Sequence, residues 1–313
     1  MYNRFRWIRD DAWRFVGAVR APTRGRGEQR APALAQGAYV ELPGRGTTFA
    51  RVTDGPAQTL PAVLLHGWTW NADINFADVI EPLSCHHRVI APDARMHGRG
   101  IRTSGPWRLR DASDDVIALL DAFGIEQALF CGFSMGGMMV ADLLTRYPDR
   151  VAGYVMQSAA AHYRQSPRER AVWVALRGLQ PLAERGLNIT AGRYFNASLP
   201  GNAALAERWD WLQAELGRQS LLEIITVAAD IGALDLRPTL RRPTCPGEYH
   251  LLTMDRVCRP SMQADLARRL GASIVSVDAD HDLPVTDAAR YIDLTVSAIR
   301  RVAAQATDRT RAS

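Results

Sequence analysis

The chain is organised around residues 131–137, which read Cys131-Gly132-Phe133-Ser134-Met135-Gly136-Gly137. The run before them, 127–131, is short and apolar, as a buried parallel strand is. The run after them, 138–147, is rich in helix formers with its polar residues mostly on one side, and Pro148 ends it. This stretch therefore predicts a strand, a very tight turn and a helix in direct succession.

The turn places special demands on the residues around Ser134. A serine on a sharp strand-to-helix turn has a strained backbone, and side chains two positions before and after it would collide, so glycine is needed at 132 and 136. The turn lifts the hydroxyl clear of the backbone at the positive end of a helix, where a developing anion is stabilised. In this context Gly-x-Ser-x-Gly is a nucleophile elbow. The pattern alone also fits a glycine-rich turn with an idle serine.

Strand and helix patterns alternate along most of the chain, after a hairpin expected over 38–53. Apolar runs typical of buried strands lie at 62–65, 88–91, 127–131, 151–156, 249–253 and 273–277. Helical patterns lie at 72–83, 111–123, 138–147, 261–270 and 286–301. The alternation predicts an α/β fold with a mostly parallel sheet, helices on both faces, and a ligand crevice at the carboxyl ends of the strands.

Residues 160–240 break this rhythm because only helical patterns follow one another there, at 168–178, 203–216 and 221–229. A helical insertion between two strands of such a sheet is expected to form a lid over the crevice, here after the sixth strand. The predicted organisation is a basic, aromatic N-terminal segment (1–36), the first part of the core (37–159), the lid (160–240), the second part of the core (241–302) and a flexible tail (303–313).

Composition narrows the class of protein. Apolar residues make up 47% of the chain and charged residues 23%, as in soluble globular proteins, and no run approaches the length of a membrane span. Residues 1–30 contain eight arginines and three acidic residues, so this segment alone accounts for the formal net charge of +5. The body is neutral overall, which argues against a nucleic-acid partner.

The first thirty residues have no apolar core of a secretory signal, and the four cysteines show no metal or disulfide spacing, so a cytoplasmic protein is expected. Arginines and aromatic residues interleave in 1–30. This segment fits an amphipathic helix that packs on its own domain or makes a weak contact with an anionic membrane surface. The oligomeric state stays open.

A serine nucleophile needs a base, and the base needs an acid to fix its tautomer. His281 follows the last predicted strand, between two aspartates, and Asp255 follows the strand before it. Both positions lie at the same sheet edge as Ser134. The order Ser134, Asp255, His281 predicts a catalytic triad.

Three stretches, one of them the elbow, carry a family resemblance. His66-Gly67-Trp68 ends a strand, residues 93–100 read Asp93-Ala94-Arg95-Met96-His97-Gly98-Arg99-Gly100, and 132–137 form the elbow. From about 37 to 302 the chain resembles an α/β-hydrolase-fold serine hydrolase of the lidded esterase and cofactor-free perhydrolase type. The resemblance implies Ser134 as nucleophile, His281 as base and Asp255 as acid, with no metal or organic cofactor. It also implies an oxyanion hole made by the backbone N–H groups of Trp68 and Met135.

The chain departs from the family pattern at several positions. Met96 stands where glycine is usual, and Gly100 where serine is usual. The stretch Cys245-Pro246-Gly247-Glu248 interrupts the start of the strand that leads to the acid, and no glycine directly precedes Asp255. Glu248 and Asp230 therefore remain alternative acids.

These features predict a hydrolase for carboxylic esters of small to medium hydrophobic substrates. The same triad could serve perhydrolysis, in a haloperoxidase-like reaction, or C–C bond hydrolysis. Epoxide hydrolases and haloalkane dehalogenases are disfavoured because they need a carboxylate where this chain has Ser134. A third hypothesis is that the protein is a non-catalytic homologue that binds a ligand in its lidded pocket without turnover.

Overall fold

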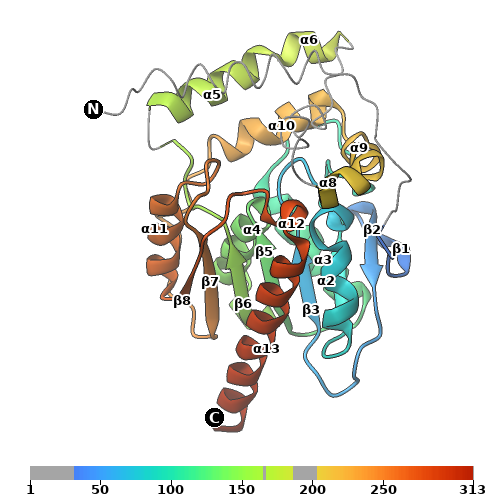
Figure 1. Cartoon of the computed structure of the whole chain (residues 1–313), viewed down its shortest axis with the longest axis vertical. Helices are drawn as coiled ribbons and strands as arrows, with labels where there is room; N and C mark the ends of the chain where they lie inside the picture. The colour runs from blue at the N-terminus through green and yellow to red at the C-terminus, as the bar shows by residue number, and fades with distance from the viewer. Residues whose placement is uncertain (1–31, 165–166, 186–202, 313) are drawn as a thin grey trace.

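The computed structural model describes residues 32–164, 167–185 and 203–312 (Figure 1). The basic segment 1–30, expected to form an amphipathic helix, lies outside the described residues. Among the described helices, none combines the length and apolar character that crossing a membrane requires.

One eight-stranded sheet forms the centre of the molecule, in the order β1-β2-β4-β3-β5-β6-β7-β8. The pairs β1–β2 and β2–β4 are antiparallel, and the other neighbours are parallel. The strand bounds are β1 Gly37–Leu42, β2 Gly46–Val52, β3 Ala62–Leu65, β4 Val89–Pro92, β5 Ala128–Phe133, β6 Val151–Gln157, β7 Gly247–Leu252 and β8 Ser273–Val277. The predicted hairpin and mostly parallel sheet are confirmed.

Two helical layers cover the sheet because the central strands are apolar on both faces. In β5, Ala128 and Phe130 pack into one core, and Leu129 and Cys131 pack into the other. The first core is closed by α3 (Leu109–Ala122), α4 (Met135–Arg146) and α11 (Pro260–Leu270). The second is closed by α2 (Ala72–Ser84) and α13 (Ala288–Ala312). Short helices η1 (Pro148–Arg150) and α12 (Leu283–Thr286) complete the core.

The regular elements described between β6 and β7 are all helices. They are α5 (Pro167–Gly178), α6 (Gln180–Glu184), α8 (Ala203–Glu207), α9 (Trp209–Leu216) and α10 (Leu221–Ile231), and Figure 1 shows these helices lying across the end of the sheet where the parallel strands finish. The expected single helix over 203–216 is two helices separated at Arg208. Leu236 N–H donates to Ala161 O at 2.9 Å, which ties the return of this segment to its departure.

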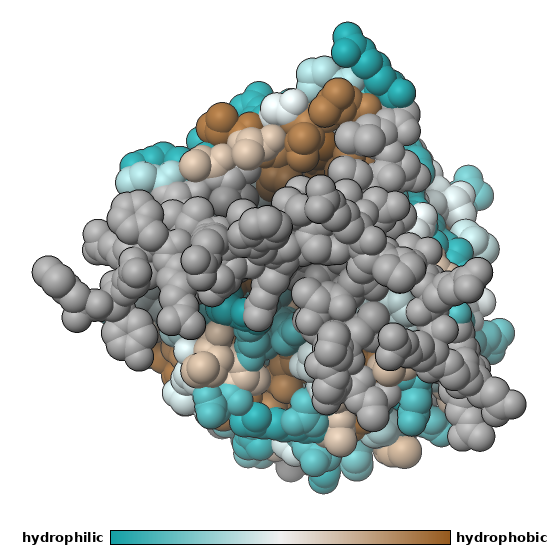
Figure 2. Space-filling view, turned by 45° about the horizontal axis from the view of Figure 1, so that its top comes forward, coloured by the Kyte–Doolittle hydropathy of each residue, from teal (hydrophilic) through white to brown (hydrophobic). Residues whose placement is uncertain are grey.

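The helical segment carries exposed apolar side chains as well as buried ones. Val174 on α5 is 70% exposed and Leu182 on α6 is 45% exposed. Figure 2 turns this end of the molecule toward the viewer and shows hydrophobic side chains gathered on part of the described surface.

Two boundaries differ from expectation. Residues 303–313 were expected to be a flexible tail, but helix α13 continues to Ala312. Val302 and Ala306 lie one turn apart on it and are both buried. Strand β7 begins at Gly247, inside the stretch that interrupted the strand pattern. Gly247 is required there, since a Cβ at this position would overlap the ring of Tyr154 on β6.

Candidate active site

The elbow has the strained geometry that its glycines indicate. Ser134 lies between β5 and α4 with φ +53° and ψ −113°, a conformation that non-glycine residues rarely adopt. A Cβ on Gly132 would overlap the backbone of Gly136, and a Cβ on Gly136 would overlap the carbonyl of Leu65 on β3. The close approach of three backbone segments therefore leaves room only for glycine at both positions.

Asp255 and His281 are in direct contact. His281 Nδ1 lies 2.9 Å from Asp255 Oδ2, and Asp255 is 4% exposed. Asp255 follows β7, while His281 follows β8 and lies two residues before the short helix α12. Two loops from adjacent strand ends thus bring the predicted base and the predicted acid together.

The carboxylate of Asp255 is held on both oxygens. Oδ1 accepts the backbone N–H groups of Val257 at 2.8 Å and Cys258 at 2.7 Å. Oδ2 accepts Gln263 Nε2 at 3.0 Å, in addition to His281. These donors fix the plane of the carboxylate relative to the imidazole.

His281 is poised to bind a proton. Burial would lower its pKa, but the negative charge of Asp255, the hydrogen bond to it, and the charges of Asp280 and Asp282 outweigh burial and raise the pKa above the ordinary value of 6.5. Its ring centroid lies 5.1 Å from that of Phe133, the residue before Ser134. His281 is therefore placed beside the elbow.

The two alternative acids lie elsewhere and have other partners. Glu248 pairs with Arg301 at 2.6 Å and with His250 at 2.9 Å. Burial would raise the pKa of Glu248, but these two partners lower it to about 2. Asp230 on α10 accepts the backbone N–H of Leu109 at 3.2 Å, and burial raises its pKa. Of the three candidate acids, Asp255 is the one that contacts His281.

The strand end at His66-Gly67 is held in one orientation. Ala94 N–H donates to His66 Nε2 at 2.9 Å, so the ring proton is on Nδ1, which donates to Gly67 O at 2.8 Å. Burial lowers the pKa of His66 against the opposing charge of Asp93, which keeps the ring neutral. Because the described peptides are all trans, the N–H of Trp68 points opposite to the Gly67 carbonyl, away from the His66 ring.

A buried chain of hydrogen bonds links this strand end to the elbow. Gly67 N–H donates to Asn75 Oδ1 at 3.0 Å, and Asn75 Nδ2 donates to the Tyr291 hydroxyl at 3.0 Å. Tyr291 donates to Gln157 Oε1 at 2.8 Å. The backbone carbonyl of Gln157 accepts Ser134 N–H at 2.8 Å. Helices α2 and α13 therefore join the two strand ends that carry the predicted oxyanion hole and nucleophile.

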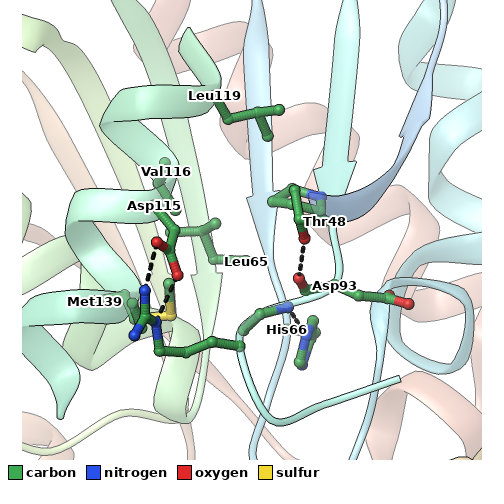
Figure 3. Close-up of a pocket in the computed structure, with 12 residues that line it drawn as sticks. Thr48, Leu65, His66, Asp93, Asp115, Val116, Leu119 and Met139 are labelled. Atoms are coloured by element: carbon green, nitrogen blue, oxygen red, sulfur yellow. Dashed lines mark hydrogen bonds and ion pairs between the residues drawn. The ribbon is translucent and has the colours of Figure 1, made fainter. Parts of the chain in front are cut away.

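The loop after β4 contains two departures from the family pattern. Met96 has φ +63°, a conformation for which glycine is favoured, and its side chain is buried. A Cβ on Gly100 would overlap the backbone of Asp93 and Ala94, so a serine has no room there. A small cavity of about 10 Å³ lies beneath this loop, with room for about one water molecule. Figure 3 shows side chains that line it, among them His66 and Asp93.

Aromatic side chains connect the strand end to the helical segment. Trp68 Nε1 donates to the carbonyl of Ile224 on α10 at 3.2 Å, and its ring lies 6.0 Å from that of Trp173 on α5. Trp173 Nε1 donates to the Tyr163 carbonyl at 3.1 Å. These rings form an apolar wall next to the predicted oxyanion hole.

Several residues that shape the site were missed by sequence reasoning. Ser158 directly follows β6 and its hydroxyl contacts Asp255 and His281. Its position, a polar residue at a strand's carboxyl end, is the same signal that singled out Ser134 and His281. Gln263 and Asn75 lie within helices, and no pattern in the sequence distinguishes them from other polar helical residues.

Comparisons with known proteins agree with this architecture. A family model described as the alpha/beta hydrolase fold matches residues 61–211. The chain is 32% identical over 161 residues to 3-oxoadipate enol-lactonase 2 of Acinetobacter baylyi, covering 50% of this chain and 58% of that protein. It is 35% identical over 106 residues to the bifunctional esterase/perhydrolase of Acinetobacter calcoaceticus, covering 34% and 38%. The aligned stretch thus spans little more than half of the first relative's length and less of the second's.

A solved structure extends the likeness to most of the chain. The enol-lactonase from Burkholderia xenovorans superposes with a TM-score of 0.67 at 24% identity, covering 84% of this chain and 100% of that one. This likeness agrees with the central sheet and the two helical layers that cover it. The chain has the α/β-hydrolase fold.

Proposed function

We propose that the protein is a serine hydrolase that cleaves carboxylic esters of small to medium hydrophobic substrates. The observation that carries the proposal is the strained Ser134 at the first turn of α4, beside the hydrogen-bonded pair of His281 and Asp255. A neutral serine, a histidine with a raised pKa and a buried carboxylate have the chemistry of an acyl-transfer triad. An enol lactone is a cyclic ester, so the likeness to an enol-lactonase supports this bond type.

In the acylation half, Ser134 Oγ attacks the ester carbon and its proton passes to His281 Nε2. Asp255 stabilises the imidazolium that forms, since it faces Nδ1 at 2.9 Å. The N–H groups of Trp68 and Met135 receive the oxyanion, the first oriented through His66 and the second at the start of α4. The bond to the leaving oxygen then breaks, and His281 returns the proton to the departing alcohol.

In the deacylation half, His281 takes a proton from water as the water oxygen attacks the acyl carbon. Collapse of the second tetrahedral intermediate breaks the bond to Ser134 Oγ, which recovers its proton from His281. One ester and one water give one acid and one alcohol. Each oxyanion donor contributes about 10²–10³ in rate, by analogy with measured donors.

The helical segment after β6 acts as a lid in this proposal. Its helices α5 and α10 contact each other and reach Trp68 through Trp173 and Ile224. The wall they provide is apolar and aromatic, which favours hydrophobic acyl or alcohol groups.

The proposal is tested by replacing Ser134 with alanine and following hydrolysis of p-nitrophenyl acetate. We expect kcat to fall by about 10³-fold or more while circular dichroism and melting temperature stay close to those of the wild type. A Ser134→Ala protein that cleaves the ester at the wild-type rate refutes the proposal. A wild-type protein that binds such esters without turnover supports the ligand-binding reading instead.

Perhydrolysis is a second candidate, favoured by the likeness to a bifunctional esterase/perhydrolase. Hydrogen peroxide would replace water at the acyl-enzyme, giving a peracid in place of the acid. Ester hydrolysis and peracid formation, measured on one preparation over a range of peroxide concentrations, distinguish the two. Peracid formation that exceeds hydrolysis at millimolar peroxide and disappears in Ser134→Ala supports the second candidate.

A further inference from the structure

Ser158 has a backbone conformation that its residue type disfavours. It directly follows β6, is fully buried and has φ +51°. A non-glycine residue in this region costs on the order of 1 kcal/mol or more, and such strain is concentrated at functional positions. Glycine would relieve the strain. The presence of serine therefore indicates that its hydroxyl has a role that offsets this cost.

The hydroxyl of Ser158 lies between the proposed acid and the proposed base. It donates to Asp255 Oδ2, the same oxygen that faces His281. Its Oγ lies 2.8 Å from His281 Nδ1. Since the hydroxyl proton is directed at the carboxylate, the Oγ lone pair accepts from the imidazole, and the Nδ1–H is shared between Asp255 Oδ2 and Ser158 Oγ.

We propose that Ser158 is a positioning residue that fixes the ring of His281 in the plane needed for proton transfer with Ser134. Two acceptors for Nδ1–H define the tilt of the imidazole ring as well as its tautomer. A single carboxylate oxygen would fix the tautomer but would leave the tilt freer to vary. This inference rests on the proposed function. It adds Ser158 as a fourth side chain to the proposed triad of Ser134, His281 and Asp255.

The backbone around Ser158 makes its position independent of the lid. Its N–H donates to the carbonyl of His250 on β7 at 3.3 Å, and the preceding residue, Gln157, accepts from Ser134 N–H at 2.8 Å. The hydroxyl is therefore held by the same two strands that carry the nucleophile and the acid. None of these partners lies in α5 or α10.

Ser158→Gly and Ser158→Ala together separate a positioning role from a merely structural one. Both variants remove the hydroxyl, but only glycine relieves the positive φ, so we expect Ser158→Gly to melt about 2–4 °C above Ser158→Ala. Both should lose about 10- to 100-fold in kcat with KM nearly unchanged, the size expected for a hydrogen bond to a charged group. Activity that follows melting temperature, or kcat within twofold of wild type in both variants, overturns the proposal.

Two further readouts make the result specific to His281. The low-field proton resonance of Nδ1–H, assigned by its loss in His281→Ala, should shift upfield in both Ser158 variants, and an unchanged resonance contradicts the proposal.

Asp255→Asn combined with Ser158→Ala should cost little more in kcat than Asp255→Asn alone, because both act through one imidazole. Additive losses contradict it. If the wild type hydrolyses no ester, the proposed function fails, while the resonance still decides whether Ser158 holds the ring.

Discussion

At the scale of single residues, the assignment of the acid depends on which carboxylate faces His281. Asp255 lies 2.9 Å from Nδ1, while Glu248 is engaged by Arg301 at 2.6 Å. We expect Asp255→Asn to lower kcat by about 10³–10⁴-fold, because an amide stabilises the wrong tautomer and cannot stabilise the imidazolium. Glu248→Gln is the matched control and should keep kcat within about threefold. The opposite ranking of the two variants would assign the acid to Glu248.

The pH dependence of activity follows from the raised pKa of His281. The base must be unprotonated, so kcat/KM should rise with pH, with a midpoint above the ordinary histidine value of 6.5. Asp255 is the main source of the increase, and Asp255→Asn should therefore move the midpoint to lower pH. Initial rates on p-nitrophenyl acetate from pH 5 to 9 measure both midpoints. A wild-type midpoint below 6.5, or no shift in the variant, would contradict this electrostatic account.

At the scale of elements, the elbow depends on close approach between β3, β5 and α4. A Cβ on Gly136 would overlap the carbonyl of Leu65, and the backbone cannot yield without moving β3. We expect Gly136→Ala to cost about 3 kcal/mol of unfolding free energy, at the upper end of overpacking costs. Gly105 lies in an exposed loop with nothing near its Cβ position, so Gly105→Ala should change stability by less than about 0.5 kcal/mol. Urea unfolding compares the two, and equal stabilities would contradict the steric account.

Elements with strong local patterns were predictable from the sequence. Strand β3 was predicted with its observed bounds, 62–65, because this apolar run lies between Pro61 and His66-Gly67 and is too short for a helix. Helix α13 was expected to end near residue 301, since the later residues are mostly polar or small, yet burial of Val302 and Ala306 against the core extends it to Ala312. The start of β7 was hard to predict because glycine and glutamate, at positions 247 and 248, are poor strand formers. In the folded chain the ring of Tyr154 leaves no room for a side chain at Gly247, and Glu248 pairs with Arg301.

The candidate site was predictable as far as chain order and strand ends determine it. Ser134, Asp255 and His281 each follow a strand of a parallel sheet, and such ends meet at one edge. The role of Ser158 depends on the direction of a single side chain under a positive φ, and that information is absent from local patterns. Asn75 contributes through a partner 216 residues away, Tyr291, which only the folded chain reveals.

At the scale of the whole molecule, the helical segment is expected to set substrate size. Trp173 lies against Trp68 at 6.0 Å, and removing its ring would open the wall beside the proposed oxyanion hole. We expect Trp173→Ala to raise the ratio of kcat/KM for p-nitrophenyl octanoate over acetate by about tenfold. Val174, the next residue on α5, is 70% exposed, and Val174→Ala should leave the ratio unchanged. An unchanged ratio in Trp173→Ala would show that the pocket lies elsewhere.

Covalent labelling tests whether Ser134 is a nucleophile that His281 activates. The full chain is treated with a fluorophosphonate probe, digested, and analysed by mass spectrometry to locate the adduct. We expect one phosphonylated residue, Ser134, with labelling slowed by about 10³-fold or more in His281→Ala. Failure of Ser134 to react, or an equal labelling rate in His281→Ala, would show that Ser134 is not a nucleophile activated by His281.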